Sequence, residues 1–292
     1  MKNADSRPLR SVLYMPASNA RAIDKARGLD ADALVFDLED AVAPDAKVDA
    51  RAQLCSELSR GGFSYRRLVA RMNGLDTPWG RADMAALAHA PVEALLAPKI
   101  DREDDIAALS LEMDRLGFAP DAALWVMIET PAAVLAIERI AAMAATTRLA
   151  GFVLGLNDLA KDTGMAQTPG REAFVPVMVG AMLAARANGL VVIDGVCNAI
   201  DDAARLEGEA RQAREFGFDG KSLIHPAQIA PVNAVFAPSD SEISQAMAIV
   251  AAFDAPENRG KGAIRVDGKM VELLHLAQAR QVIATADAIA SR

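Results

Sequence analysis

Seven charged or titratable residues stand at or just after the ends of short apolar runs in this chain. They are Glu39, Asp40, Arg71, Lys99, Glu129, Asp158 and His225. Carboxylates at such positions can hold a divalent ion or move protons, and a guanidinium can bind a carboxylate through two parallel hydrogen bonds. This recurrence indicates an enzyme in which the ends of the runs meet at one site.

The apolar runs themselves predict the scaffold that brings these residues together. Eight runs recur, at residues 10–16, 33–40, 67–73, 94–99, 124–129, 151–158, 190–194 and 220–225. Segments with helical spacing separate them, and such alternation is typical of buried parallel strands joined by right-handed crossovers. Eight units fit a closed (β/α)8 TIM barrel, which builds its active site at the C-terminal ends of the strands.

Glu129 and Asp158 follow consecutive strands, so both carboxylates are expected at the same mouth of the barrel. Two carboxylates without accompanying histidines favour a hard, oxygen-binding ion, Mg²⁺ first and Mn²⁺ as the alternative. The other interpretation is that each carboxylate caps the following helix or bonds to a neighbouring barrel residue. The pairing of the two favours the metal site.

Arg71 is interpreted as a clamp for a substrate carboxylate, or else as a salt-bridge partner of Glu39 or Asp40. Its five donors permit both roles together. Strand alternation places Glu39 and Asp40 on different faces. We expect them to support the site, by bonding to water on the metal or by fixing Arg71, and not to bind the ion directly. His225, a lone histidine before a proline, is either a structural hydrogen-bonding residue or a catalytic one.

Composition excludes several other classes of protein. The 292 residues carry a net charge of −8 and only 4% aromatics, with no basic stripe, which argues against nucleic acid as a partner. No apolar stretch approaches the roughly 20 residues of a membrane span, and the N-terminus lacks the apolar segment of a signal peptide. Two cysteines indicate no disulfide framework. A cytoplasmic location is therefore expected.

The C-terminal part is expected to be an extension of the barrel. We place a single catalytic barrel at residues 1–253 and a connector with a helical lid at residues 254–292. The stretch Asp254–Gly262 is rich in charge and glycine, and residues 273–289 have the pattern of an amphipathic helix. Such a tail can cover the mouth of its own barrel or that of a neighbour.

The same stretches, in the same order, resemble the HpcH/HpaI aldolase and citrate lyase family. The resemblance is greatest to its branch of citrate lyase β-subunit-like proteins and malyl-CoA or citramalyl-CoA lyases. It covers nearly the whole chain and rests on residues 10–16, 36–44, 71–77, 128–130, 155–159, 220–226 and 268–270.

This resemblance implies a Mg²⁺-dependent lyase that splits a 3-hydroxyacyl thioester of CoA or of an acyl carrier protein into an acyl thioester and a 2-oxo acid. It makes Glu129 and Asp158 the metal ligands, with Glu129 also close to the substrate, and it makes Arg71 the clamp on the oxo-acid carboxylate. Asp40 joins Arg71 among the catalytic groups. Four further positions match residues near the CoA-bearing substrate: Tyr14, Lys25, Asn157 and His225.

Two positions depart from the family pattern. Lyase relatives often carry an arginine where this chain has Asn19, and an aspartate where it has Glu272. Glu272 keeps the carboxylate on a longer arm, and we take it as the proton relay of the lid. Members of this branch commonly form trimers or dimers of trimers, in which a C-terminal segment closes a neighbour's site, so a homo-oligomer is expected.

Three other activities stay open at this point. The first is an aldolase acting on pyruvate and an aldehyde without CoA. The second is a malate synthase-like condensation followed by thioester hydrolysis. The third is a subunit that works only inside a citrate lyase complex, or a metabolite-binding protein without turnover.

Overall fold

The computed structural model describes residues 7–292, and the predicted closed barrel is present. Each strand pairs in parallel with the next one, and the eighth pairs with the first. The strands are β1 (Ser11–Pro16), β2 (Ala33–Asp37), β3 (Arg67–Arg71), β4 (Ala94–Ala97), β5 (Ala123–Ile128), β6 (Leu149–Leu154), β7 (Val191–Asp194) and β8 (Gly220–Leu223). Every strand overlaps one of the eight predicted apolar runs. The closed order of the eight parallel strands confirms the (β/α)8 fold class.

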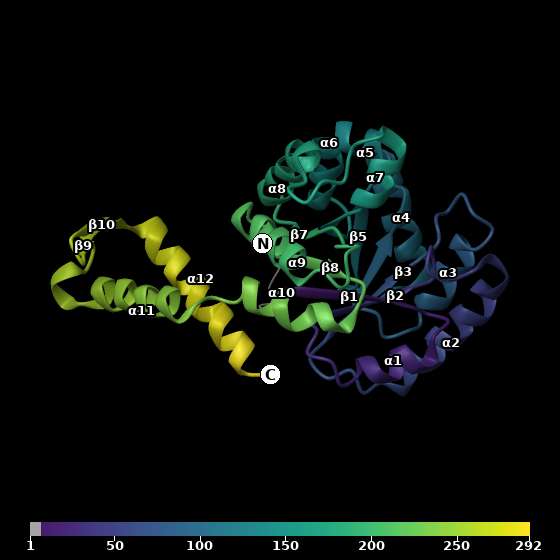
Figure 1. The fold of residues 1–292 in the computed structure, drawn as a ribbon, viewed down its shortest axis with the longest axis horizontal. Coiled ribbons are helices and arrows are strands. Elements are labelled where there is room, and N and C mark those ends of the chain that lie inside the picture. Colours follow the sequence, from purple (N-terminus) through teal and green to yellow (C-terminus); the bar gives the residue numbers. More distant parts are fainter. Residues whose placement is uncertain (1–6) are drawn as a thin grey trace. The chain divides into compact units, whose positions relative to one another are not determined.

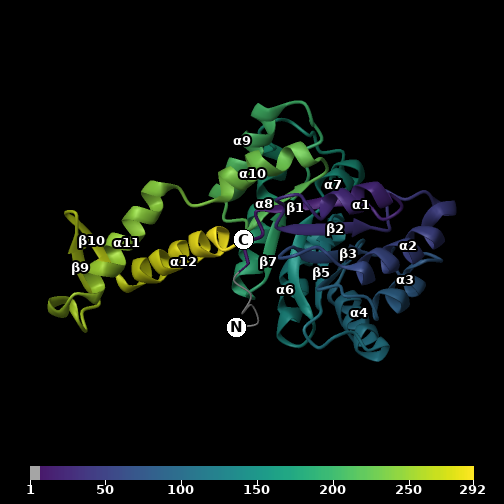
Figure 2. The ribbon, with the colours of Figure 1, turned by 90° about the horizontal axis from the view of Figure 1, so that it is seen from below.

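Helices surround the strands, as Figures 1 and 2 show from two directions. They are α1 (Ala20–Ala26), α2 (Lys47–Arg60), α3 (Gly80–Leu87), α4 (Glu103–Leu116), α5 (Pro131–Leu135), α6 (Ile137–Ala142), α7 (Leu156–Thr163), α8 (Val175–Ala187), α9 (Ala203–Glu215) and α10 (Ile229–Phe236). Within residues 7–292, none of the helices combines the length and the apolar character that a membrane crossing requires.

Alternation along the strands separates two packed layers. One set of side chains, which includes Val12, Val35, Val69 and Trp125, packs together inside the barrel. The residues between them, such as Leu34 and Phe36 of β2, pack against the surrounding helices in the larger core. A residue two positions beyond an inward-facing one therefore also points inward, and at the C-terminal end of a strand it reaches the mouth of the barrel.

Charged side chains also occupy the layer between the barrel and the helices. The ammonium of Lys221 on β8 lies 2.8 Å from a carboxylate oxygen of Asp194 on β7 and 3.1 Å from one of Glu209 on α9. Arg171 donates to both oxygens of Asp194 at 2.8 Å. All four residues are buried. Asp194 ends a predicted run, but it faces the helices and takes no part in the mouth.

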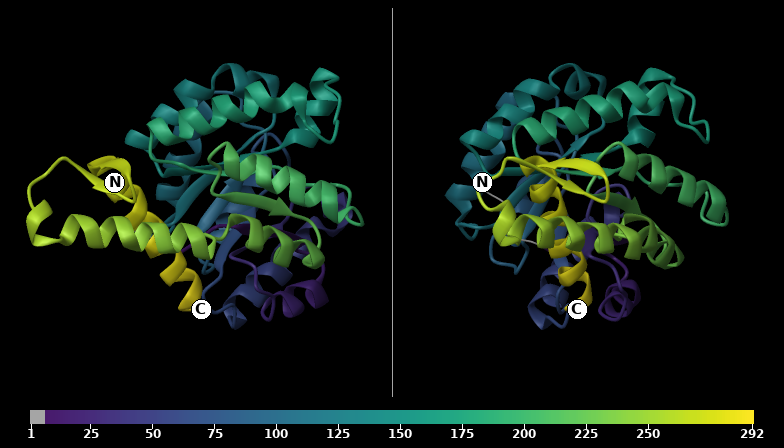
Figure 3. Two further views of the ribbon diagram at one scale, coloured as in Figure 1. Left: turned by 60° about the vertical axis from the view of Figure 1, so that its left-hand side comes forward. Right: turned by 90° about the vertical axis from the view of Figure 1, so that its left-hand side faces the viewer.

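The chain divides into two compact units, and the second includes residues 237–292. The sequence-based boundary at residue 253 lies at the end of α11 (Asp240–Asp254), whereas the compact units divide before this helix. Figure 3 shows α11 followed by the antiparallel hairpin of β9 (Ala263–Val266) and β10 (Lys269–Glu272), and then by α12 (Leu273–Ala290). A small apolar cluster holds this unit together, made of Phe253, Ile264, Val271 and Leu276.

Candidate active site at the mouth of the barrel

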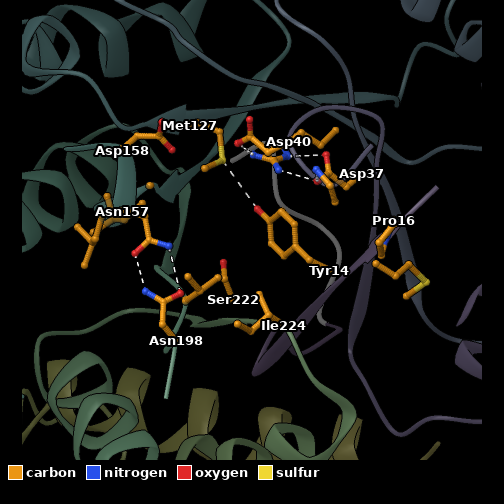
Figure 4. A pocket seen from close by; sticks show the side chains of 17 residues that line it. Tyr14, Pro16, Asp37, Asp40, Met127, Asn157, Asp158, Asn198, Ser222 and Ile224 are labelled. Carbon is orange, nitrogen blue, oxygen red and sulfur yellow. Dashed lines mark hydrogen bonds and ion pairs between the residues drawn. The ribbon is translucent and has the colours of Figure 1, made fainter. Parts of the chain in front are cut away.

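A cavity of about 410 Å³ opens at the C-terminal ends of the strands. We call it the mouth cavity. Figure 4 shows Tyr14 between Asp37 and Asp40 on one side and Asn157 and Asp158 on the other. Of the residues singled out from the sequence, it is lined by Tyr14, Asp40, Arg71, Asn157 and Asp158. The barrel therefore brings these five residues to one place, as strand-end position predicts for Asp40, Arg71 and Asp158 and as the family resemblance implies for Tyr14 and Asn157.

Arg71, the last residue of β3, is held mainly by Asp37. Its Nε and Nη2 donate to the two carboxylate oxygens of Asp37 at 2.8 and 2.6 Å. Its Nη1 lies 2.6 Å from Glu39 and 3.4 Å from Asp40. Burial alone would lower the pKa of Arg71, but Asp37 and Glu39 outweigh it and hold the pKa above the usual value. The predicted salt bridges to Glu39 and Asp40 are present, and Asp37 is a stronger partner than either.

The carboxyl group of Glu39, which lies against Arg71, has a strongly raised pKa. Burial raises its pKa to about 8, although the guanidinium of Arg71 acts in the opposite direction. The 2.6 Å contact with Arg71 Nη1 favours the ionised form, so the pKa of Glu39 is set by burial acting against this ion pair. Desolvation also raises the pKa of the Tyr14 phenol above its usual value, and the ring lies 5.6 Å from the guanidinium carbon of Arg71.

Glu129 and Asp158 face each other across the ammonium of Lys99. Lys99 Nζ lies 2.5 Å from Asp158 Oδ1 and 3.5 Å from Glu129 Oε1. Glu129 is fully buried directly after β5, whereas Asp158 lies in the first turn of α7 and is half-buried. Burial raises the pKa of Glu129, and Lys99 partly offsets this shift. The two carboxylates therefore share one positive charge.

This pair fits a hard divalent ion. Glu129 Oε1 accepts a hydrogen bond from the backbone N–H of Lys99 at 2.8 Å, while Oε2 is buried and has no hydrogen-bond partner within residues 7–292. In that same range, no group of three or more His, Cys, Asp or Glu side chains is arranged to hold a metal. Mg²⁺ needs only one or two carboxylates, since water and substrate oxygens complete its shell. The unpartnered oxygen and the cation already between the carboxylates support such a site.

Amide side chains form the opposite rim of the mouth cavity. Asn157 and Asn198 exchange hydrogen bonds of 3.2 and 2.7 Å, and Gln167 donates to Asn157 at 3.0 Å. Asn198 and Ser222 also line the cavity but were not predicted. Asn198 follows β7 in a loop, where no apolar run marks its position. Ser222 lies within β8, and strand alternation was the signal that could have revealed it.

Three other predicted residues have local roles that the structure describes. Among the described residues, neither Lys25 nor His225 lines the mouth cavity, and both side chains are exposed. His225 Nδ1 accepts a hydrogen bond from the N–H of Ala227 and caps the turn Pro226–Gln228, which is the structural role that the sequence left open. Glu272 belongs to the second unit, where it caps α12. Substrate contacts by these three residues stay predictions.

Comparisons with known proteins agree with this geometry. The profile of the family described as HpcH/HpaI aldolase/citrate lyase matches residues 10–226. A (3S)-malyl-CoA thioesterase of Cereibacter sphaeroides is 48% identical over 284 residues, which cover 97% of this chain and 96% of the relative. An L-malyl-CoA/β-methylmalyl-CoA lyase of the same species is 32% identical, with 98% and 97% covered.

A solved structure of protein CitE from Mycobacterium tuberculosis, in complex with magnesium, acetoacetate and coenzyme A, is similar over nearly the whole chain. Its TM-score is 0.76 at 27% identity, with 97% of this chain and 100% of that one covered. The resemblance noted from the sequence motifs is thereby confirmed at the level of the family. This chain belongs to the HpcH/HpaI aldolase/citrate lyase family.

Proposed function

We propose that this protein is a Mg²⁺-dependent enzyme that hydrolyses the thioester bond of a 3-hydroxydicarboxylic acyl-CoA of the malyl-CoA type. The thioesterase relative, at 48% identity over almost the full chain, supports hydrolysis. Cleavage of the carbon–carbon bond, the expectation from the sequence, is the second candidate, because the lyase relative covers the same span at lower identity. Both reactions would use the same mouth cavity.

One observation carries the proposal: two carboxylates converge on a cation beside a buried guanidinium. Glu129 and Asp158 would hold Mg²⁺, which supplies a Lewis acid for substrate oxygens when bound. The unpartnered Oε2 of Glu129 gives this site a free ligand atom. Arg71 borders the same cavity and can bind the terminal carboxylate of the substrate through Nη1, in exchange for the exposed Asp40.

The proposed hydrolysis balances without a further reactant. The oxygen of water bonds to the thioester carbonyl carbon, the carbon–sulfur bond breaks, and a proton from the water ends on the sulfur of CoA. Malyl-CoA would give malate and free CoA. In the alternative lyase reaction, the bond between the α- and β-carbons breaks and the hydroxyl proton is lost. The enolate then takes up a proton, so the products are acetyl-CoA and glyoxylate.

The remaining predicted groups enter as parts of this proposal. Asn157 on the rim, together with Lys25 and His225, would contact the CoA portion, and Asp40 would assist Arg71. Glu272 would relay a proton from the lid of a neighbouring subunit, which requires a homo-oligomer, a trimer or a hexamer. The lid would exclude water that is not taking part in the reaction.

The deciding experiment measures all four products after incubation of the purified protein with malyl-CoA and Mg²⁺. Free CoA thiol and malate in equal amounts, without glyoxylate, would support hydrolysis. Formation of glyoxylate and acetyl-CoA would instead show that the protein cleaves the carbon–carbon bond, as a lyase does. If none of the four products formed under conditions in which a known malyl-CoA enzyme was active, both candidates would be rejected.

The variant Asp158→Asn tests the metal site, because it removes the charge of one proposed ligand with little change in the shape of the side chain. Product formation should fall by a factor of about 100 or more, as when a charged group that stabilises the transition state is removed. Full activity of the parent protein in EDTA would contradict the metal requirement.

A further inference from the structure

The ammonium of Lys99 occupies the position between Glu129 and Asp158 where a metal ion would bind. Its Nζ lies 2.5 Å from Asp158 Oδ1 and 3.5 Å from Glu129 Oε1. The ammonium of Lys99 and a Mg²⁺ ion cannot both contact these two carboxylates at once, because the two cations would repel each other at such short range. Lys99 and Mg²⁺ would therefore compete for Glu129 and Asp158.

We propose that Lys99 is a built-in placeholder cation, which neutralises the two carboxylates in the metal-free protein and is displaced when Mg²⁺ binds. The inference rests on the proposed metal site and adds a residue that sets its affinity. Glu129 is buried and Asp158 half-buried, so without a nearby cation their repulsion would be costly. Lys99 reduces that repulsion.

The backbone at Lys99 is built to hold this side chain in place. Its φ is +53°, in the left-handed region that residues other than glycine rarely adopt, and its N–H donates to Glu129 Oε1. The same residue thus binds Glu129 through both its main chain and its side chain. The main-chain bond can persist after the ammonium leaves, so Glu129 would stay oriented for the ion.

A place for the displaced side chain exists beside the site. The side chain of Lys99 is 39% exposed, so its movement breaks little packing. It also lines a second cavity of about 270 Å³, together with Asp76 and Asp101. The same cavity is also lined by Asp105 and Arg102, so a displaced ammonium would meet three carboxylates and one like charge there.

Lys99→Met tests the proposal by Mg²⁺ titration in a calorimeter and by thermal unfolding in EDTA. The variant should bind Mg²⁺ about three- to tenfold more tightly than the parent, because no internal cation has to leave. Its melting temperature without metal should fall, and the rise on adding saturating Mg²⁺ should exceed that of the parent. Equal or weaker Mg²⁺ binding by the variant would overturn the proposal.

Two further variants keep the test decisive. Lys99→Asn should behave like Lys99→Met while suiting the left-handed backbone, since asparagine adopts this region readily. Lys161→Met removes the same charge from an exposed position on α7, the helix of Asp158, and should change Mg²⁺ affinity less than twofold. Absence of Mg²⁺ binding in the parent protein would instead reject the metal site on which the inference rests.

Discussion

At the scale of single residues, the mouth cavity is organised by the division of Arg71 among three carboxylates. Asp37 engages Nε and Nη2, whereas Nη1 faces the half-buried Glu39 and the exposed Asp40. The first pair fixes the orientation of the guanidinium, because two parallel hydrogen bonds to one carboxylate hold the plane of the group. Nη1 would exchange its longer contact with the exposed Asp40 for a contact with a substrate carboxylate.

Arg71→Lys tests this division. Lysine keeps the charge but lacks the planar fork, so it cannot keep two parallel hydrogen bonds to Asp37 while it also binds a substrate carboxylate. We expect kcat/KM for the thioester to fall by an amount equivalent to about 2–5 kcal/mol of transition-state stabilisation. Steady-state kinetics measure the loss, and thermal unfolding of the same variant separates it from instability. An unchanged kcat/KM would leave Arg71 as a structural partner of Asp37.

Glu39 makes a distinct prediction about pH. Because burial raises its pKa to about 8 from an ordinary 4.5, the folded protein retains a proton that the unfolded chain releases between these values. Its contribution to stability is complete below pH 4.5 and is lost as the pH rises through 8. In EDTA, the free energy of unfolding of the parent protein should therefore decline across this range relative to that of Glu39→Gln.

The decline is at most about 1.4 kcal/mol per pH unit for one proton. Denaturant unfolding at several pH values, with both proteins in the same buffers, measures the difference. If the two proteins changed in parallel from pH 5 to 8, Glu39 would be ionised throughout and would serve only as a partner of Arg71.

At the scale of elements, strand ends position the ligands and a glycine makes room for one of them. Gly155 follows β6, and a Cβ placed there would lie 2.4 Å from the Cβ of Glu129 and 2.7 Å from its Oε2. Its φ is −101°, so glycine is needed for space and not for backbone conformation. The turn from β6 into α7 thus leads to Asp158 and, through Gly155, leaves space for Glu129, the proposed ligand that follows β5.

Gly155→Ala should push Glu129 out of position. We expect Mg²⁺ binding at least about tenfold weaker and stability lower by roughly 1–3 kcal/mol, the usual cost of an overpacked interior. Calorimetric titration and denaturant unfolding measure the two effects. The control is Gly180→Ala in α8, where a Cβ would have no close neighbour. It should leave Mg²⁺ affinity unchanged and stabilise the helix by about 0.5–1 kcal/mol.

At the scale of the whole molecule, the second unit carries Glu272 at the start of α12 and several exposed apolar side chains. Met270, Leu273 and Leu274 lie together along β10 and the first turn of α12 and are all more than half exposed. Apolar surface of this kind is typical of contact with another chain. It supports the proposal of a homo-oligomer in which this unit acts as a lid on a neighbour.

Complementation between subunits tests the lid. Glu272→Ala and Asp158→Ala proteins should each be inactive, and a mixture that has exchanged subunits should regain part of the activity, since some sites then combine an intact lid with an intact metal pair. Light scattering establishes the oligomeric state, and tagged subunits establish exchange. No recovery after demonstrated exchange would show that the lid closes its own barrel or that Glu272 is not catalytic.

The sequence by itself determined the barrel, the end of it that carries the site, and several of the charged residues at the mouth. These follow from local physics: buried parallel strands read as continuous apolar runs, and the polar residue that ends each run must emerge at the same rim. Arg71, Glu129 and Asp158 were found in this way. Tyr14 and Asn157 came from resemblance to the family, and both line the cavity.

Tertiary structure alone decided the pairing of Arg71 with Asp37 and of Lys99 with Glu129 and Asp158. Asp37 is the main partner of Arg71 because residues in register on neighbouring strands share the inward face, while Asp194 faces the helices through the same alternation. Lys99 stands between the two carboxylates because of a left-handed backbone that no sequence pattern announced. Pairing depends on distances across the barrel, between segments far apart along the chain, and these are set only when the sheet closes.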